Sequence, residues 1–419
     1  MNSAHAPARR APPTPDAARI LERIDALAQV SEQADGLTRV YLSPQHAEAN
    51  RLVGAWMREA GMAVHVDAAG NVIGRREGDQ PGLPCLMLGS HLDSVRSAGR
   101  YDGMLGVLTA IECVQTLGNQ ALAFAIEVVG FGDEEGVRFQ ATMLGSRALT
   151  GRFDPALLEL RDGTGVSLHD AFSAFGLDPA AIGTAARRRE DVFAYVEYHI
   201  EQGPVLEAEG LPVGVVTAIN GQQRFRVQVD GMAGHSGTVP MRLRQDALAA
   251  AAECVLAAER IAAGVPDAVA TVGQLTPSPG ATNVIPGRAV FSLDVRSPRD
   301  ADRAQVASAI LDECRAIATR RRVGIEIAQT HALASCGCAP WLQDQLSAAI
   351  ATDGHRVVAL PSGAGHDAMA MVALTDVAML FLRCRDGISH HPAESITAED
   401  AATGARVLQG FIEHFEPRR

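Results

Sequence analysis

The sequence has no excess of positive charge, no long apolar run and few aromatic residues. Its formal net charge is −12 over 419 residues, and aromatic side chains make up 4%. Nucleic acids and anionic membrane surfaces attract basic proteins, so neither is expected as a partner. No stretch approaches the roughly 20 apolar residues of a transmembrane helix. What remains is the ordinary composition of a soluble globular protein.

The start of the chain and the cysteines also argue against a secreted, disulfide-bonded protein. Residues 1–15 are rich in Pro, Ala and Arg and lack the apolar core of a secretory leader, so we expect a frayed tail. The seven cysteines are scattered and odd in number, which fits reduced thiols and a cytoplasmic location. We interpret Cys336-Gly337-Cys338 as a loop. The turn Gly363-Ala364-Gly365 is too short for a phosphate-binding loop and lacks its lysine.

The most informative segment runs from Gly89 to Glu135. Apolar runs of strand length, Pro84 to Leu88 and Ala121 to Phe131, flank apolar residues at helical spacing. This pattern predicts a β-α-β unit, whose sheet binds ligands just beyond the carboxyl ends of its strands. The residues of metal-binding type at those ends are His91, Asp93, Asp102, Glu134 and Glu135. The sequence therefore predicts a metal site at this edge.

The order of the expected elements predicts two domains, one inserted into the other. Residues 16–212 and 331–419 have the pattern of an α/β domain with a mixed, mostly parallel sheet and helices on both faces. Residues 213–330 alternate strands and Ala-rich helices, which predicts an α+β sandwich with an antiparallel sheet and one wet face. The expected strands of this insertion include Val213–Ile219, Arg224–Val229, Ala268–Leu275 and Ala289–Val295.

Two further histidines follow apolar runs of strand length. His199 lies near the end of the run that begins at Asp191, and His390 follows the run from Val377 to Leu382. With His91, Asp102 and Glu135 they make five candidate ligands, which suits two ions that share a carboxylate better than one tetrahedral zinc.

The remaining acidic residues have natural roles around such a centre. Asp102 is placed to bridge the two ions, and Asp93 is placed to orient the imidazole of His91. Glu134 is then available as the general base for a water molecule. Together these residues predict a centre that hydrolyses an amide-like bond.

The chain also resembles a known family over nearly its whole length, from about Ile20 onward. Nine motifs, in order, are similar to those of the M20-type metallo-amidohydrolases, in particular the hydantoinase/carbamoylase branch. That branch includes allantoate amidohydrolases, N-carbamoyl-L-amino acid hydrolases, β-ureidopropionases and ureidoglycolate hydrolases. The motifs are G-S-H-L-D-S-V, G-R-Y-D-G, G-D-E-E-G-V-R-F, H-I-E-Q-G-P, G-M-A-G-H-S-G-T-V-P-M, T-N-V-I-P-G, D-V-R-S-P, S-G-A-G-H-D-A and I-S-H-H-P-A-E.

The resemblance implies a role for each of these residues. It implies two divalent ions, zinc or else manganese, cobalt or nickel, held by His91, Asp102, Glu135, His199 and His390, with Asp102 bridging and Glu134 as base. It implies that Arg296 pairs with the substrate carboxylate and that His235 polarises the scissile carbonyl. Further substrate contacts are implied for Gln202, Arg224, Asn283 and the backbone of Gly365. The inserted domain is implied to form a homodimer and to act as a lid.

The resemblance also orders the possible functions. The first is hydrolysis of a ureido acid with release of ammonia and carbon dioxide, with allantoate slightly ahead of N-carbamoyl-L-amino acids. The second is a metallopeptidase or deacylase, although such peptidases usually have a carboxylate where this chain has His199. A non-catalytic relative is third, and it predicts loss of a ligand or of the base. One departure is His391, where many relatives have Asn, so that two adjacent histidines compete; we choose His390.

Overall fold

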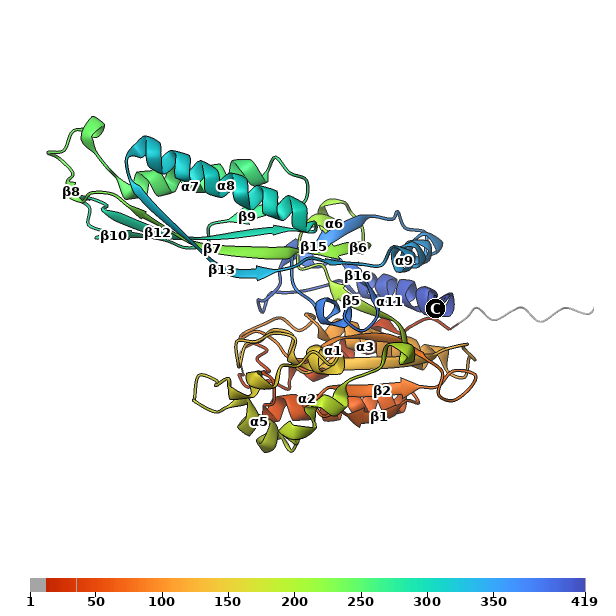
Figure 1. The fold of residues 1–419 in the computed structure, drawn as a ribbon. Coiled ribbons are helices and arrows are strands. Elements are labelled where there is room, and N and C mark those ends of the chain that lie inside the picture. The colour runs from red at the N-terminus through yellow and green to blue at the C-terminus, as the bar shows by residue number, and fades with distance from the viewer. Residues whose placement is uncertain (1–12, 35, 419) are drawn as a thin grey trace, which may run out of the picture. The chain divides into compact units, whose positions relative to one another are not determined.

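The computed structural model describes residues 13–34 and 36–418, which form two compact units (Figure 1). The first unit contains the chain up to Val216, Cys338–Leu360 and the residues from His366 onward, and the second contains Thr217–Gly337 and Pro361–Gly365. The second unit is thus flanked in sequence by parts of the first. Most of the expected tail over residues 1–15 lies outside the described residues.

The first unit is built on a mixed sheet. Its strands are β1 (Ala63–Val66), β2 (Val72–Arg76), β3 (Cys85–His91), β4 (Ala125–Phe131), β5 (Val192–Ile200), β6 (Val213–Ile219), β15 (Ala359–Ser362) and β16 (Asp376–Leu382). The central strands β4, β3, β5 and β16 are parallel, while β1, β2 and β6 are antiparallel to their neighbours. Every residue of β3 and β4 is buried, as expected for strands covered on both faces.

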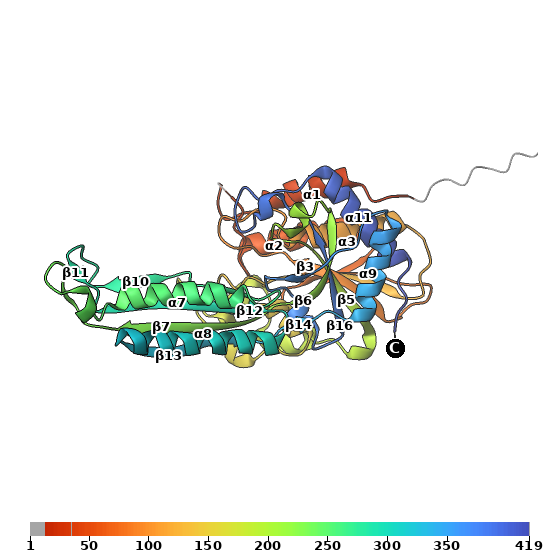
Figure 2. The same ribbon diagram turned by 90° about the horizontal axis from the view of Figure 1, so that it is seen from above.

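The described residues of the first unit also form helices. They are α1 (Ala17–Ala28), α2 (Pro44–Glu59), α3 (Met104–Leu117), α4 (Leu144–Leu149), α5 (Leu168–Phe175), α6 (Val205–Ala208), α9 (Pro340–Thr352), α10 (Ala368–Met371) and α11 (Ala398–Glu413). Helix α3 contacts β3, β4 and β5, and α9 and α11 contact β16 (Figure 2). Helix α1 begins where the carboxylate of Asp16 accepts the N–H groups of Ala18 and Arg19. The α3 connection between β3 and β4 is the predicted β-α-β unit.

A small second core lies beside α2 and α5. His46, which is fully buried in the first turn of α2, contacts Tyr41 and Phe175 of this core. Its Nδ1 accepts the N–H of Leu42 at 3.0 Å, and its ring stacks on Phe175 with centroids 4.9 Å apart. Burial lowers the pKa of His46 to about 4, so this imidazole is neutral in the folded protein near neutral pH.

The second unit is an antiparallel sheet covered by two helices. Its elements are β7 (Gly221–Asp230), β8 (Gly234–His235), α7 (Ala247–Ala262), β9 (Val269–Thr271), β10 (Leu275–Ser278), β11 (Val284–Ile285), β12 (Arg288–Ser297), α8 (Asp300–Arg321), β13 (Gly324–Leu333) and β14 (Cys336–Gly337). The main sheet has the order β10-β12-β7-β13, with β9 also on β12. Burial alternates along β12, and its buried residues pack against α7 and α8. The other face of the sheet is therefore the wet one.

Two local expectations for the second unit need correction. The run Ala268–Leu275 is not one strand. Thr271 pairs with Asp294 and Leu275 with Phe291, so three residues oppose two and the extra residue separates β9 from β10. Cys336-Gly337 is also not loop but the short strand β14, which pairs with the end of β6.

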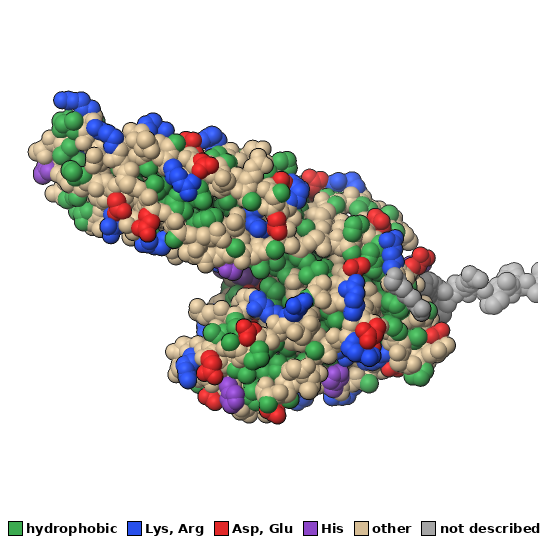
Figure 3. All heavy atoms as spheres, in the orientation of Figure 1, with side chains coloured by type: hydrophobic (Ala, Val, Ile, Leu, Met, Phe, Trp, Pro, Cys, Tyr) green, Lys and Arg blue, Asp and Glu red, His purple; other side chains and the backbone are tan. Residues whose placement is uncertain are grey.

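The limits of the second unit differ from the expected 213–330. Strand β13 continues to Leu333 along β7, which extends the unit beyond residue 330. The segment Pro361–Gly365 joins it as well, because the carbonyl of Ser362 accepts the N–H of Asn220 at 2.9 Å. Acidic and basic side chains are mixed on the face of each unit drawn in Figure 3. Among the described residues, no helix has both the length and the apolar character needed to cross a membrane.

Candidate metal centre

The candidate ligands gather at the carboxyl ends of the parallel strands. His91 is the last residue of β3, and His199 is the penultimate residue of β5. Glu134 and Glu135 follow β4, and His390 lies in the loop after β16. Asp102 comes from the loop between β3 and α3. Parallel strands place their carboxyl ends along one edge, and this brings residues from five separate segments together.

Asp102 is the centre of the arrangement. Its Oδ1 lies 3.1 Å from Nε2 of His199 and 3.5 Å from Nε2 of His91, while its Oδ2 lies 3.2 Å from Nε2 of His390. Oε1 of Glu135 lies 3.5 Å from the same nitrogen of His390. The ligand atoms of His91, Asp102 and His199 lie within 4.8 Å of one another, and so do those of Asp102, Glu135 and His390. The two groups share Asp102 through different oxygens.

Backbone carbonyls orient two of the imidazoles. Nδ1 of His199 lies 2.8 Å from the carbonyl oxygen of Ile200, and Nδ1 of His91 lies 3.0 Å from that of Asp93. A proton on Nδ1 satisfies each carbonyl and leaves the Nε2 lone pair directed at the cluster. The adjacent Gly103 has φ +77°, and a Cβ there would lie 2.6 Å from the ring of His91, so only glycine fits.

The carboxylate of Asp93 does more than orient His91. It lies 3.5 Å from Nδ1 of His91, but it also accepts the N–H of Glu134 at 3.0 Å and the N–H of Glu135 at 3.1 Å. Asp93 is 1% exposed. Asp93 therefore holds the backbone of Glu134 and Glu135, which follow β4, close to the end of β3. The spacing of these residues in the sequence did not indicate this contact.

The buried charges of the site call for a cation. Burial, followed by Glu135, raises the pKa of Glu134 well above its ordinary value, and burial followed by Asp102 raises the pKa of Glu135 to about 7. Burial acts in the same direction on Asp102, but hydrogen bonds from His199, His390 and His91 hold its pKa well below the usual range. Four carboxylates and three imidazoles gathered at one edge of the sheet are a donor set for a divalent metal, and a bound cation would balance the buried carboxylates. The residues present fit a metal centre.

The adjacent histidines occupy different positions. Nε2 of His390 faces Asp102 and Glu135, whereas Nδ1 of His391 accepts the N–H of Ala393 at 3.0 Å. The structure thus brings His390 to the cluster and leaves His391 outside it. The side chain of His390 is 50% exposed, whereas the side chains of the other four candidate ligands are at most 9% exposed, so His390 lies on the solvent side of the cluster.

Three further polar residues lie around the cluster. The sequence predicted a different role for Gln202 and no role for Ser389 and Glu394. Nε2 of Gln202, expected to contact substrate, donates to Oδ2 of Asp102 at 3.0 Å and to the hydroxyl of Ser389 at 2.9 Å. Glu394 accepts the N–H groups of Tyr101 and Asp102. Ser389 and Glu394 belong to the motif I-S-H-H-P-A-E, and that membership was the only signal for them in the sequence.

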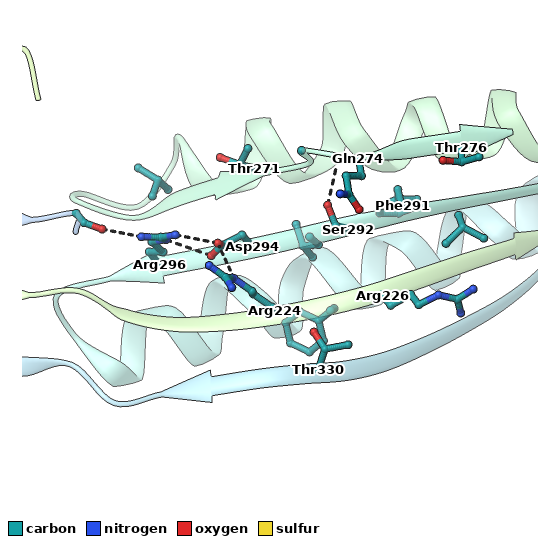
Figure 4. Close-up of a pocket in the computed structure, with 16 residues that line it drawn as sticks. Arg224, Arg226, Thr271, Gln274, Thr276, Phe291, Ser292, Asp294, Arg296 and Thr330 are labelled. Atoms are coloured by element: carbon teal, nitrogen blue, oxygen red, sulfur yellow. Dashed lines mark hydrogen bonds and ion pairs between the residues drawn. The ribbon is translucent and has the colours of Figure 1, made fainter. Parts of the chain in front are cut away.

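The candidate substrate residues of the second unit fall into two groups. Arg224 on β7 and Arg296 on β12 lie on the face opposite the helices, in a cavity of about 880 Å³ (Figure 4). His235 and Asn283 lie beyond the other end of these strands, where the N–H of Ser236 donates to the carbonyl of Asn283 at 3.0 Å. Gly365 closes the segment Pro361–Gly365, whose Gly363 lines the cavity.

Asp294 joins the two arginines of the cavity. Nη2 and Nε of Arg296 lie 3.0 and 3.3 Å from its two carboxylate oxygens, and Nε of Arg224 lies 3.1 Å from Oδ2 (Figure 4). Nη1 of Arg296 donates to the carbonyl of Gly363 at 2.8 Å. Two guanidinium groups and one carboxylate leave a net charge of +1, so this cluster still attracts an anion.

An α/β unit with imidazole and carboxylate side chains gathered at its strand ends is typical of metal-dependent hydrolases. The family model described as peptidase family M20/M25/M40 matches residues 87–414. The chain therefore belongs to this family, and its relatives place it among the amidohydrolases of the hydantoinase/carbamoylase branch.

The similarity to individual relatives extends over nearly the whole chain. The chain is 44% identical over 393 residues to an N-carbamoyl-L-amino acid amidohydrolase of Geobacillus stearothermophilus, covering 93% of this chain and 96% of that protein. It is 38% identical over 424 residues to an allantoate deiminase of Arabidopsis thaliana, covering 93% and 81%. A hydantoinase/carbamoylase-family amidase of known structure from Burkholderia multivorans is 33% identical, with a TM-score of 0.90 and coverage of 97% and 99%.

Proposed function

We propose that this protein hydrolyses the ureido group of a ureido acid and releases ammonia and carbon dioxide. The observation that carries the proposal is the pair of ligand groups joined at Asp102, in a chain similar to N-carbamoyl-L-amino acid amidohydrolases and allantoate deiminases. Identities of 44% and 38% to the two kinds of relative do not separate the substrates. Allantoate and N-carbamoyl-L-amino acids are therefore compared directly in the assay below.

The site is proposed to hold two divalent ions. His91, His199 and Asp102 would bind one, and His390, Glu135 and Asp102 the other, with zinc, manganese, cobalt and nickel all compatible with this donor set. Ions held there would supply Lewis-acid chemistry, polarising a carbonyl oxygen and favouring the ionisation of water. Asp93 contributes by keeping the segment from Glu134 to Glu135 against β3.

Glu134 is the proposed general base. Its backbone is held by Asp93, and its carboxylate lies with the cluster of His91 and Glu135. In this role it accepts a proton from the attacking water at a carboxylate oxygen and returns it to the departing nitrogen.

The proposed anchor for the substrate carboxylate is the arginine pair of the second unit. Asp294 holds Arg296 by two contacts and Arg224 by one, which orients both guanidinium groups before any ligand binds. Roles for His235 at the oxyanion and for Asn283, Gln202 and the Gly365 backbone as substrate contacts stay predictions.

The test is turnover of a panel of substrates by metal-reconstituted protein, measured as ammonia for the ureido acids and as free amino acid for the other compounds. The panel contains allantoate, N-carbamoyl-L-amino acids, a dipeptide and an N-acyl amino acid. Turnover of a ureido acid well above the last two supports the proposal, and the faster ureido acid identifies the substrate. Faster cleavage of the dipeptide or the N-acyl compound would contradict it and favour a metallopeptidase or deacylase.

A homodimer formed through residues 213–330 is proposed as the assembly. Strand β13 is an edge of the second sheet, and all ten of its residues are exposed or half-buried. An exposed edge of this length is a natural site for pairing with a second copy. Sedimentation should show a dimer, and a monomer that stays fully active over a wide concentration range would refute this assembly.

A further inference from the structure

Glu394 is a buried carboxylate that lies outside the proposed ligand set. It is 3% exposed. Its Oε1 accepts two backbone N–H groups of the loop before α3, from Tyr101 at 2.8 Å and from Asp102 at 3.1 Å. These residues are separated from it by more than 290 positions in the sequence. Glu394 thus connects the segment that carries the shared ligand to the C-terminal part of the first unit.

Its second oxygen is directed to the loop that carries His390. The hydroxyl of Ser389 lies 3.2 Å from Oε2 of Glu394 and 3.1 Å from Oδ2 of Asp102, and it accepts a hydrogen bond from Gln202. A hydroxyl has one hydrogen, so Ser389 donates to one of the two carboxylates at a time. Ser389, the neighbour of His390, is therefore connected to Asp102 both by its own hydrogen bond and through Glu394.

The loop before α3 is shaped to approach Glu394 closely. A Cβ on Gly99 would lie 2.3 Å from the Cβ of Glu394 and 2.4 Å from its Oε1. No side chain fits at such distances, so the loop reaches the two N–H contacts only because position 99 is glycine. This close approach is a second observation, independent of the hydrogen bonds, that Glu394 sets the position of the loop.

We propose that Glu394 is a positioning residue that sets the spacing between Asp102 and His390 and so determines how tightly their shared ion is held. This inference rests on the two-ion site proposed above. Both ligands lie on loops, where the 3.2 Å between Oδ2 of Asp102 and Nε2 of His390 depends on outside support. Glu394 supplies that support from one side chain, with one oxygen for each loop.

Substitutions at Glu394 distinguish the effect of its hydrogen bonds from the effect of its negative charge. In Glu394→Gln the amide oxygen keeps both backbone N–H contacts, and its NH₂ donates to Ser389, whose hydrogen then goes to Asp102. In Glu394→Ala all of these contacts are lost. Gly99→Ala leaves Glu394 intact but forces the loop away from it. The proposal therefore predicts a defect in the last two variants and near wild-type behaviour of Glu394→Gln.

The matched control is Glu201. This residue is 8% exposed, and its carboxylate also accepts two backbone N–H groups, from Val205 and Leu206 at 2.8 Å each. It lies two residues after His199, so Glu201→Ala reports any general effect of loosening a loop beside a ligand. His199 itself is held by the pairing of β5 with β16, so metal binding of this control should stay at wild-type level.

The experiment is titration of metal-free full-length protein with Zn²⁺ by calorimetry, with metal content after dialysis and thermal unfolding of the metal-free form. Loss of an outer contact of this kind weakens metal binding about 10-fold to 100-fold. We expect that loss for one of two bound ions, the one that Asp102 and His390 share, in Glu394→Ala and Gly99→Ala, with the other ion retained. Glu394→Gln should stay within a few-fold of wild type.

Three results would overturn the inference. They are wild-type Zn²⁺ binding by Glu394→Ala, a defect in Glu394→Gln as large as in the alanine variant, and equal weakening in Glu201→Ala. If wild-type protein binds a single ion, the two-ion proposal fails by itself. Glu394 is then judged on that one ion, because Asp102 belongs to both ligand groups.

Discussion

Arg296→Lys tests whether the substrate is held by a carboxylate. The guanidinium of Arg296 forms two hydrogen bonds with Asp294 and one with Gly363, and its side chain is 32% exposed. A half-exposed ion pair of this kind contributes only about 0.2–1 kcal/mol to folding. Lysine keeps the charge beside Asp294, which also retains Arg224 and Gln222 as partners. We therefore expect the melting temperature and metal content to stay near those of wild type.

Catalysis should respond much more strongly than stability. Lysine lacks the planar fork that binds a carboxylate by two parallel hydrogen bonds. Breaking the bidentate contact with the substrate carboxylate in a closed site is expected to cost about 2–5 kcal/mol, which corresponds to a fall in kcat/KM of about 30-fold to 5,000-fold. The same variant should lose little on a substrate whose carboxylate is replaced by a primary amide. The assay is ammonia release with the acid and the amide, measured side by side.

The chain offers two controls for this experiment. Arg226 lines the same cavity on β7, where its guanidinium donates a 3.4 Å hydrogen bond to Gln228, so Arg226→Lys should leave kcat/KM nearly unchanged. The sequence contains no lysine, so its 37 basic residues are all arginine, and Arg296→Lys introduces the only side-chain amine. Protection of that amine from an acylating reagent by the acid, but not by the amide, would place the carboxylate there. If wild-type protein processes the amide as fast as the acid, the anchor argument is refuted.

The other predictions concern the centre and the small core. Glu134→Gln should keep the bound metal and lose about 10²-fold to 10⁴-fold in kcat; full activity with full metal content would remove Glu134 from its role. Asp102→Ala should lose metal from both ligand groups, and two ions per chain by metal analysis would disprove the shared ligand. The pKa of His46 is lowered to about 4, so the unfolded chain binds more protons between about pH 6.5 and 4. Stability should therefore fall by up to about 3 kcal/mol as pH decreases through that window, and His46→Gln should remove this part of the dependence in denaturant unfolding curves.

The strand ends could be read from the sequence because their signal is local. Apolar runs of strand length end at or beside His91, His199 and the residues before Glu134, and a parallel sheet brings such ends to one edge. The choice of His390 over His391 came from the family motif, and the geometry adds the contact with Asp102.

Contacts between distant loops could not be read in this way. Nothing in the spacing of Glu394 and Tyr101 indicates that one accepts a hydrogen bond from the other. The break between β9 and β10 depends on one extra residue opposite β12, which the apolar pattern does not reveal. The second role of Asp93 likewise depends on where the backbone of Glu134 lies in space, not on its distance along the chain.

The flanking of the second unit by parts of the first has a consequence for how the protein is made on the ribosome. Synthesis is vectorial, so β3, β4 and β5 emerge before the second unit, and β16 with His390 emerges only after it. Residues 217–337 contain their own core of β7, β12, α7 and α8 and can fold while β5 still lacks β16 as its neighbour. Until β16 pairs with β5, the unpaired backbone groups of β5 can form hydrogen bonds with another chain, which favours aggregation of the nascent protein. Because His390 is the last ligand in chain order, a complete set of ligands exists only after that late strand has been inserted.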